Sequence, residues 1–234
     1  LAMSPCFVLG FGAMLGDQIS GPQRRSVILD VTGFALAVLA FTLALYLPHA
    51  DPGAPVTFIV LTGYPVLLFG ATAAGVVVQL HLRQRPTPAT LAVIGGLGGF
   101  GALWMAWNLA FLNNQQRAGA GMTLAFSVLA LLLGWGAAHW RPARDASERH
   151  DRLCEALLRQ IPLAMVAFTA AAVAFIVLGV GVPLQARTPL LALCALVFVC
   201  AIVRQTQQLR DRDRLLAAGR AVAEGQARLR HLAH

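Results

Sequence analysis

The chain has 234 residues, of which 58% are hydrophobic and only 12% are charged, and its formal net charge is +8. Its mean hydropathy is +0.69, and soluble domains carry about 25% charged residues. This composition excludes an ordinary soluble domain and predicts an all-α membrane protein. All eighteen basic residues are arginine, which excludes a retinal protein because its Schiff base requires a lysine.

Seven apolar stretches are candidates for membrane-spanning helices, which need about 20 apolar residues to cross about 30 Å of hydrocarbon. The predicted spans are 1–16, 26–48, 56–82, 89–112, 118–140, 161–183 and 188–204. We therefore expect a seven-span transmembrane bundle over 1–203, followed by a cytoplasmic connector helix over 204–234.

Arginine content alternates between the pieces that join these spans. The six connections carry 2, 0, 2, 1, 5 and 1 arginines in order, and the C-terminal piece carries 7. Because cationic connections resist translocation, the rich pieces are predicted to be cytoplasmic, with residue 1 outside and the C-terminus in the cytoplasm. Arginines that follow topology indicate membrane lipids, and not nucleic acid, as their partners.

Asp30 is the ionisable residue expected inside a span, about one turn from the cytoplasmic face. A charge in the bilayer is costly, so Asp30 is either one half of an interfacial ion pair or a proton-relay or ligand residue. Arg24 or Arg25, in the preceding connection, is the expected partner. Such sparse polarity argues against a proton-coupled transporter.

Glycines in the fourth span predict close helix packing. Gly95 and Gly99 have the small-xxx-small spacing that lets two helix backbones approach each other. The same glycine run lacks the Lys-Ser/Thr that a phosphate-binding loop requires.

A polar and aromatic set in the outer half of the bundle is the candidate ligand pocket. Its members are Tyr46, Tyr64, Trp104, Trp107 and Asn108. Pro65 leaves a backbone carbonyl near Leu61 without its helical donor, so that carbonyl can accept a bond from a ligand or a neighbouring side chain. The alternative is an aromatic belt at the membrane interface.

Residues for catalysis or metal binding are not apparent. The four cysteines form no C-x-x-C pair, no two histidines share a helix face within a span, and no nucleophile lies beside a base. We expect this chain to have no catalytic residue, metal or cofactor of its own.

Two segments outside the spans are predicted to be helical. Residues 147–160 should form a helix that runs on into the sixth span, where it either contacts the C-terminal helix or remains a solvated surface helix. In 204–234, a seam with heptad spacing can pair two helices, although glycines at 219 and 225 weaken it. The seam residues are Leu215, Ala218, Val222, Leu229 and Leu232.

The C-terminal residues Leu229, His231, Ala233 and His234 match the L-x-H-x-A-H ending of the connector that precedes the GGDEF domain in bacterial cyclic-di-GMP signalling proteins. The stretch 63–70, GYPVLLFG, also resembles the Y-P-L-L-L-x-G pattern of some membrane input regions in this family. The resemblance implies an inner-membrane sensor that homodimerises through its connector and controls a diguanylate cyclase or phosphodiesterase domain. None of that domain's catalytic residues is present.

These observations predict a transmembrane input module that senses a small-molecule, lipid or extracytoplasmic cue and passes it along the C-terminal helix. An input region of a histidine kinase has the same architecture. A small-solute transporter is the alternative from another class, and it requires repeats and polar groups at the membrane midplane. A scaffold that only tethers an enzyme is a further alternative.

Overall fold

The computed structural model of the protein is almost entirely helical in the part of the chain that it describes. The described residues are 10, 21–49, 55–112, 120–141, 147–178 and 184–232. The elements are α2 (Gly21–Tyr46), the short 3-10 helix η1 (Leu47–His49), α3 (Pro55–His81), α4 (Pro88–Leu112), α5 (Ala120–Ala138), α6 (Glu148–Leu178) and α7 (Leu184–Leu232).

Six of these helices are long and apolar enough to cross a membrane. This confirms the expected all-helical fold and supports a multi-pass membrane protein, and six of the seven predicted spans coincide with a described helix. The remaining predicted span, 1–16, lies outside the described residues except for residue 10.

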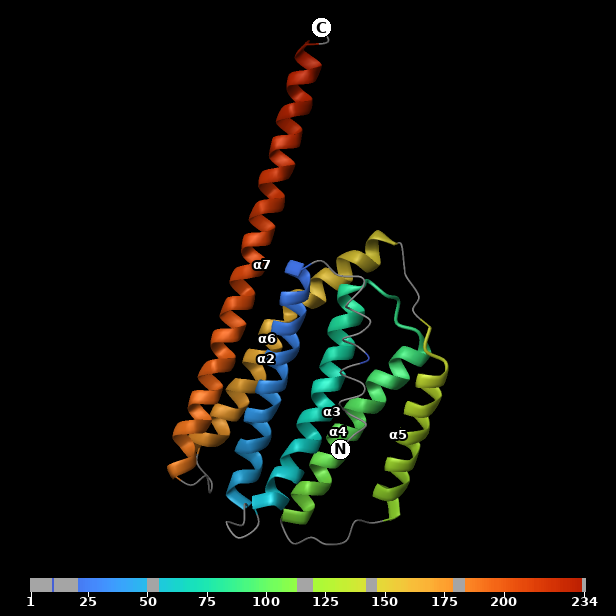
Figure 1. Ribbon diagram of the computed structural model, residues 1–234, viewed down its shortest axis with the longest axis vertical. Helices are drawn as coiled ribbons and strands as arrows, with labels where there is room; N and C mark the ends of the chain where they lie inside the picture. Colours follow the sequence, from blue (N-terminus) through green and yellow to red (C-terminus); the bar gives the residue numbers. More distant parts are fainter. Residues whose placement is uncertain are drawn as a thin grey trace.

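The helices lie side by side, with α5 and α7 at opposite edges of the bundle (Figure 1). Neighbouring helices in the sequence pack together from α2 through α5, whereas α6 and α7 pack against each other and against α2. The central helix is therefore α2, which contacts α3, α6 and α7.

Small residues allow this close packing around α2. Ala37, Ala40 and Ala44 are fully or almost fully buried and lie three and four residues apart on one face. They form apolar clusters with α6 and α7, in which Met165 and Val197 are also fully buried. Such stripes bring helix backbones together in a bilayer, where packing contacts replace the hydrophobic effect.

Glycines mediate the contact between α4 and α5. A Cβ atom on Gly96 or Gly99 would come within 2.8 Å of a leucine side chain of α5, and one on Gly136 within 2.8 Å of the Ala89 carbonyl oxygen. The expectation of close packing holds for Gly99 but is wrong for Gly95, which has nothing within 4 Å. The face of α4 that packs against α5 thus contains Gly96 and Gly99, and not Gly95.

Local sequence signals account for several helix ends. The Thr87 hydroxyl accepts a bond from the Thr90 amide at 3.1 Å, so Thr87 caps α4 and Pro88 takes the first helical position. Ser147 caps α6 in the same way through the His150 amide, at 3.2 Å. Both caps satisfy amide groups that have no partner within their own helix.

Two helices extend beyond their predicted spans. Helix α6 begins at Glu148, which confirms the predicted helix that runs into the sixth span. Helix α7 has 49 residues without a break, a length of about 70 Å at 1.5 Å per residue. It projects well beyond the other helices (Figure 1).

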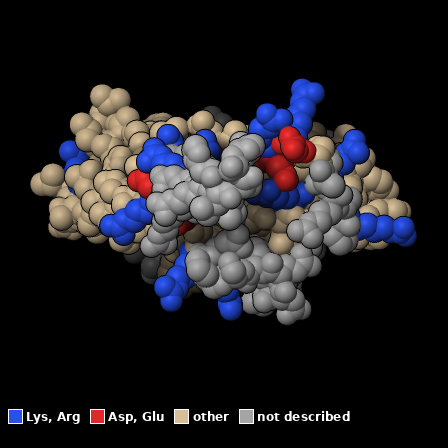
Figure 2. All heavy atoms as spheres, turned by 90° about the horizontal axis from the view of Figure 1, so that it is seen from above, with Lys and Arg blue, Asp and Glu red and all other residues tan. Residues whose placement is uncertain are grey.

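The end of the bundle from which α7 projects carries Arg83, Arg152, Arg159 and Arg204, and we call it the arginine-rich end. Figure 2 looks onto this end and shows arginine side chains around it, with acidic side chains among them. The other end, where α3, α5 and α7 begin, is called the opposite end.

Candidate functional site

The most buried charged contact among the described residues joins the first described helix to the last. Arg204 of α7 donates from Nε to Oδ1 of Asp30 on α2, at 2.6 Å, and the two side chains are 6% and 0% exposed. Two opposite charges removed from water stabilise a fold only when they remain together. The pair therefore fixes α7 to α2 at the point where α7 leaves the bundle.

The prediction that Asp30 pairs with Arg24 or Arg25 is wrong. Arg24 and Arg25 precede Asp30 in the same helix, whereas the observed partner is Arg204, 174 residues later. His81 of α3 lies within electrostatic range of both charges and bonds the Val77 carbonyl through Nδ1 at 3.0 Å. Three helices thus bring ionisable groups to one buried position.

A second charged contact holds the α3–α4 connection against α6. Arg83 donates to Asp151 Oδ2 at 2.7 Å and to Glu155 Oε1 at 3.2 Å. Arg83 has a φ of 51°, and its neighbour Gln84 donates from its amide to the Gln79 carbonyl at 3.1 Å. This is a Schellman turn at the end of α3, in which the residue with left-handed backbone is usually glycine. The ion pairs of Arg83 therefore offset the cost of placing a residue with a Cβ atom in that conformation.

The amphipathic part of α6 also contacts α7. Gln208 donates from Nε2 to the Leu158 carbonyl at 3.1 Å. Of the two alternatives for residues 147–160, the structure shows contact with the C-terminal helix. The α6 extension therefore connects the α3–α4 connection to α7 at the arginine-rich end.

At the opposite end, polar side chains bond to backbone carbonyls of neighbouring helices. Asn108 donates to the Leu61 carbonyl at 2.7 Å, which is the carbonyl expected to be released by Pro65. Tyr46 donates to the Met105 carbonyl at 3.3 Å. Both side chains are almost completely buried, so these bonds join α2, α3 and α4 inside the bundle.

Aromatic rings adjoin these polar groups. The centroids of Tyr64 and Trp104 are 4.8 Å apart, and those of Trp104 and Trp107 are 5.9 Å apart. Phe126 of α5 lies 5.4 Å from Trp104 and 5.5 Å from Trp107. Phe126 was not among the expected residues, because only its position on α5 reveals its neighbours.

All five residues of the candidate pocket thus belong to one cluster at the opposite end, which we call the aromatic cluster. Tyr46 and Asn108 are buried between helices, unlike residues of an aromatic belt. The three other rings are half-buried and face both the cluster and the surface. Trp135 is 47% exposed near the arginine-rich end, as a belt residue would be.

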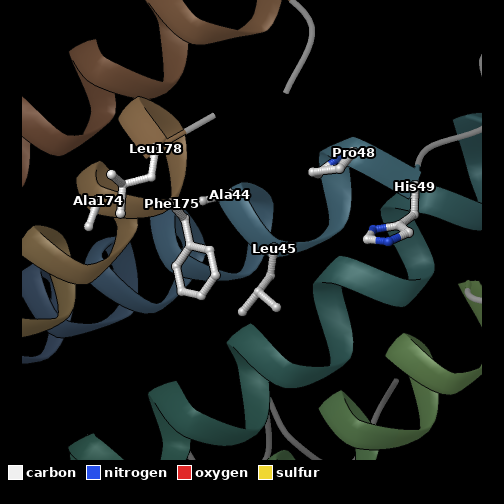
Figure 3. A pocket seen from close by; sticks show the side chains of 7 residues that line it. All are labelled: Ala44, Leu45, Pro48, His49, Ala174, Phe175 and Leu178. Carbon is white, nitrogen blue, oxygen red and sulfur yellow. The ribbon is translucent and has the colours of Figure 1, made fainter. Parts of the chain in front are cut away.

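An apolar cavity of about 410 Å³ also lies at the opposite end, between α2 and α6. Leu45 and Phe175 project into the same space, and Pro48 and His49 lie at its edge (Figure 3). Its lining residue Leu45 precedes Tyr46 in the sequence, but the cavity is lined by none of the residues of the aromatic cluster. Its walls come from helices that are far apart in the chain, so no short stretch of sequence indicates this cavity.

The predicted seam lies on α7, and its side chains fall outside the described ones. Leu215, Ala218, Val222, Leu229 and Leu232 are part of the continuous helical backbone.

Among the described residues, no three His, Cys, Asp or Glu side chains are grouped as metal ligands. In comparisons with known proteins, no family model, curated protein or solved structure matched the chain.

Proposed function

We propose that this chain is a membrane-embedded signal-input module that transmits a change in its helix bundle through α7. The observation that carries the proposal is the continuity of α7. A single helix contributes a membrane span, an ion pair with α2 and a long segment beyond the bundle. A movement of its buried part therefore displaces or rotates its projecting part.

Helix α2 provides the link between the two ends of the bundle. Tyr46 belongs to the aromatic cluster and Asp30 binds Arg204, and both residues lie on this one helix. They are separated by about 24 Å along the helix axis. A ligand that shifts α2 at Tyr46 therefore changes the position of Asp30 and, through it, of Arg204.

The aromatic cluster is the proposed site of the cue. The half-buried rings of Tyr64, Trp104 and Trp107 suit a small amphipathic molecule or a lipid. The buried Tyr46 and Asn108, already bonded to backbone carbonyls, would carry a shift of this cluster to the neighbouring helices. The alternation of arginines supports an orientation in which the aromatic cluster lies toward the outside and the arginine-rich end is cytoplasmic. We infer that the membrane is a bacterial inner membrane, from the resemblance of the connector.

The proposed receiver is a GGDEF-type diguanylate cyclase, or a phosphodiesterase, joined after His234. The chain is proposed to homodimerise through the seam on α7, because these cyclases work as dimers. A stimulus would then change how two α7 helices pair. The paired helices would act as an element with two alternative states. A histidine kinase as receiver would use the same bundle and the same helix.

Insertions in α7 test this proposal. A diguanylate cyclase domain is fused after His234, two residues are inserted at Gly219, and cyclic-di-GMP is measured in cells. Two inserted residues rotate the distal helix by about 200°, so we expect the output to change at least severalfold. Four inserted residues rotate it by about 400°, close to one full turn, and should restore much of the output.

Equal output from all three fusions, with intact protein in the membrane, would contradict transmission through α7. Topology reporters provide a separate check. A reporter joined after His234 should be active in the cytoplasm, and one placed at residues 50–54 should be active outside. The reverse pattern would show that the cue and receiver are assigned to the wrong sides.

A further inference from the structure

A cleft between α6 and α7 opens at the arginine-rich end, where α7 leaves the bundle. It has a volume of about 330 Å³ and is lined by Arg159, Arg204 and Arg212 together with Gln205 and Gln208. We propose that this cleft binds the phosphate-bearing headgroup of an anionic phospholipid. Such a site depends on the chain's own residues and on the membrane, and not on any receiver domain.

The three arginines supply the chemistry that a phosphate diester requires. A guanidinium has five N–H donors in one plane, and phosphate oxygens accept them in pairs. Arg204 is held in place by Asp30, and that bond uses only its Nε–H. Arg159 and Arg212 are exposed on the two sides of the cleft, one on each helix.

Two acidic residues also line the cleft, and both already have partners. Glu155 accepts from Arg83 at 3.2 Å and lies 3.8 Å from Arg159. Asp211 also has an interaction of its own. Because the contact between Glu155 and Arg159 is long and its side chains are half or more exposed, it holds Arg159 only weakly. Arg159 can thus turn to a bound phosphate.

The position of the cleft favours a lipid over a soluble phosphate compound. Exposed apolar side chains lie on the bundle side of it on both helices: Leu163 on α6 is 60% exposed, and Ile202 and Val203 on α7 are 64% and 42% exposed. A ligand with a phosphate group and acyl chains would contact the arginines and these residues together. Basic pockets between membrane helices are common sites for acidic headgroups.

A bound headgroup would bridge α6 and α7. It would contact Arg159 on one helix and Arg212 on the other, alongside the existing bond between Gln208 and the Leu158 carbonyl. The lipid therefore adds to the contacts that hold the base of the projecting helix.

Native mass spectrometry of the full chain in detergent tests the proposal. The protein is mixed with equal amounts of phosphatidylglycerol and phosphatidylcholine, and the retained lipids are counted. The wild type should retain phosphatidylglycerol selectively. The double variant Arg159→Gln/Arg212→Gln should lose that selectivity by at least about tenfold, because two phosphate contacts are removed.

The matched control is Arg141→Gln/Arg210→Gln. It removes the same charge from the same end, but neither residue lines the cleft. We expect it to retain the lipid as the wild type does. Since all four arginines are exposed, both variants should fold, and circular dichroism is the measurement that checks this.

Soluble glycerol phosphate separates the two possible sources of the phosphate. Under the proposal, millimolar glycerol phosphate displaces little phosphatidylglycerol, because it lacks the acyl chains. Tight binding of glycerol phosphate with no selective retention of the lipid would assign the cleft to a free phosphate compound and overturn the proposal. Equal losses in the two double variants, or no preference for phosphatidylglycerol in the wild type, would overturn it as well.

Discussion

Helices α5 and α7 form the two edges of the bundle and are attached in different ways. Helix α5 packs against α4 through glycines, so that Gly136 lies directly against the backbone of Ala89 and Val93. Helix α7 packs against α2 and α6 and adds the buried ion pair between Asp30 and Arg204. The attachment of α5 thus depends on close packing alone, whereas the attachment of α7 depends on packing together with a buried ion pair.

This difference indicates which edge can move. Close backbone packing has a single good arrangement, since any separation of the helices leaves unfilled space. The buried ion pair can be exchanged for other partners only when α7 itself moves, because a shift of the helix brings the Arg204 guanidinium to water or lipid headgroups at the membrane surface. The α7 edge is therefore the one suited to transmit a change.

The largest expected effect comes from breaking the pair at the α7 edge. Asp30→Leu leaves Arg204 buried without its counter-charge, which should cost about 3 to 5 kcal/mol of unfolding free energy. The measurement is unfolding in mixed detergent micelles. The double variant Asp30→Leu/Arg204→Met removes both charges and should regain most of the loss.

Glu148→Gln is the matched control for the Asp30 variant. Glu148 lies 3.8 Å from Arg152, and both side chains are largely exposed, so its loss should cost about 0.5 kcal/mol or less. A similar cost for Asp30→Leu and Glu148→Gln would mean that the buried pair does not hold the α7 edge.

An intermediate effect is expected at the α5 edge. The Cβ atom of Gly136→Ala would lie 2.8 Å from the Ala89 oxygen and 3.0 Å from the Val93 nitrogen, and neither backbone atom can move aside alone. Separating the helices should cost about 1 to 3 kcal/mol, measured by the same unfolding assay. Gly134→Ala is the control, because nothing lies within 4 Å of its Cβ. Equal tolerance of the two substitutions would show that α5 is not closely packed.

The smallest effect is expected where α7 meets the α6 extension. Gln208→Ala removes the bond to the Leu158 carbonyl and should cost about 0.5 to 1 kcal/mol, since the bond is partly exposed. Gln205→Ala, on an exposed position three residues earlier, should change the unfolding free energy by less. A loss of unfolding free energy at Gln208 as large as that at Asp30 would mean that the contact with the α6 extension, and not the buried ion pair, is the main attachment of α7.

The helices themselves were predictable because continuous apolar runs have few alternatives to a membrane span. The helix over 147–160 was also predictable, since Leu153, Leu157 and Leu158 recur at helical spacing ahead of the span. Pro65 gave a third signal: it predicted a released carbonyl near Leu61, and Asn108 bonds it. Each of these signals lies within a short stretch of sequence.

Contacts between distant helices could not be predicted in the same way. Arg204 resembles any arginine at the end of a span, and only the arrangement of α2 against α7 gives it Asp30 as a partner. Gly95 and Gly96 are equally small, and the rotation of α4 decides which of them faces α5. Phe126 likewise joins the aromatic cluster only through the packing of α5 against α4.

The separation of 174 residues between Asp30 and Arg204 has a consequence for biogenesis. Asp30 enters the bilayer with α2, and its partner leaves the ribosome only about 10 to 35 s later at ordinary rates of synthesis. During that interval the carboxyl group must rely on water or headgroups near the membrane surface. Completion of the bundle is thus linked to the arrival of α7, so a chain that stops before this helix would retain an unpaired acid and be a natural target for membrane quality control.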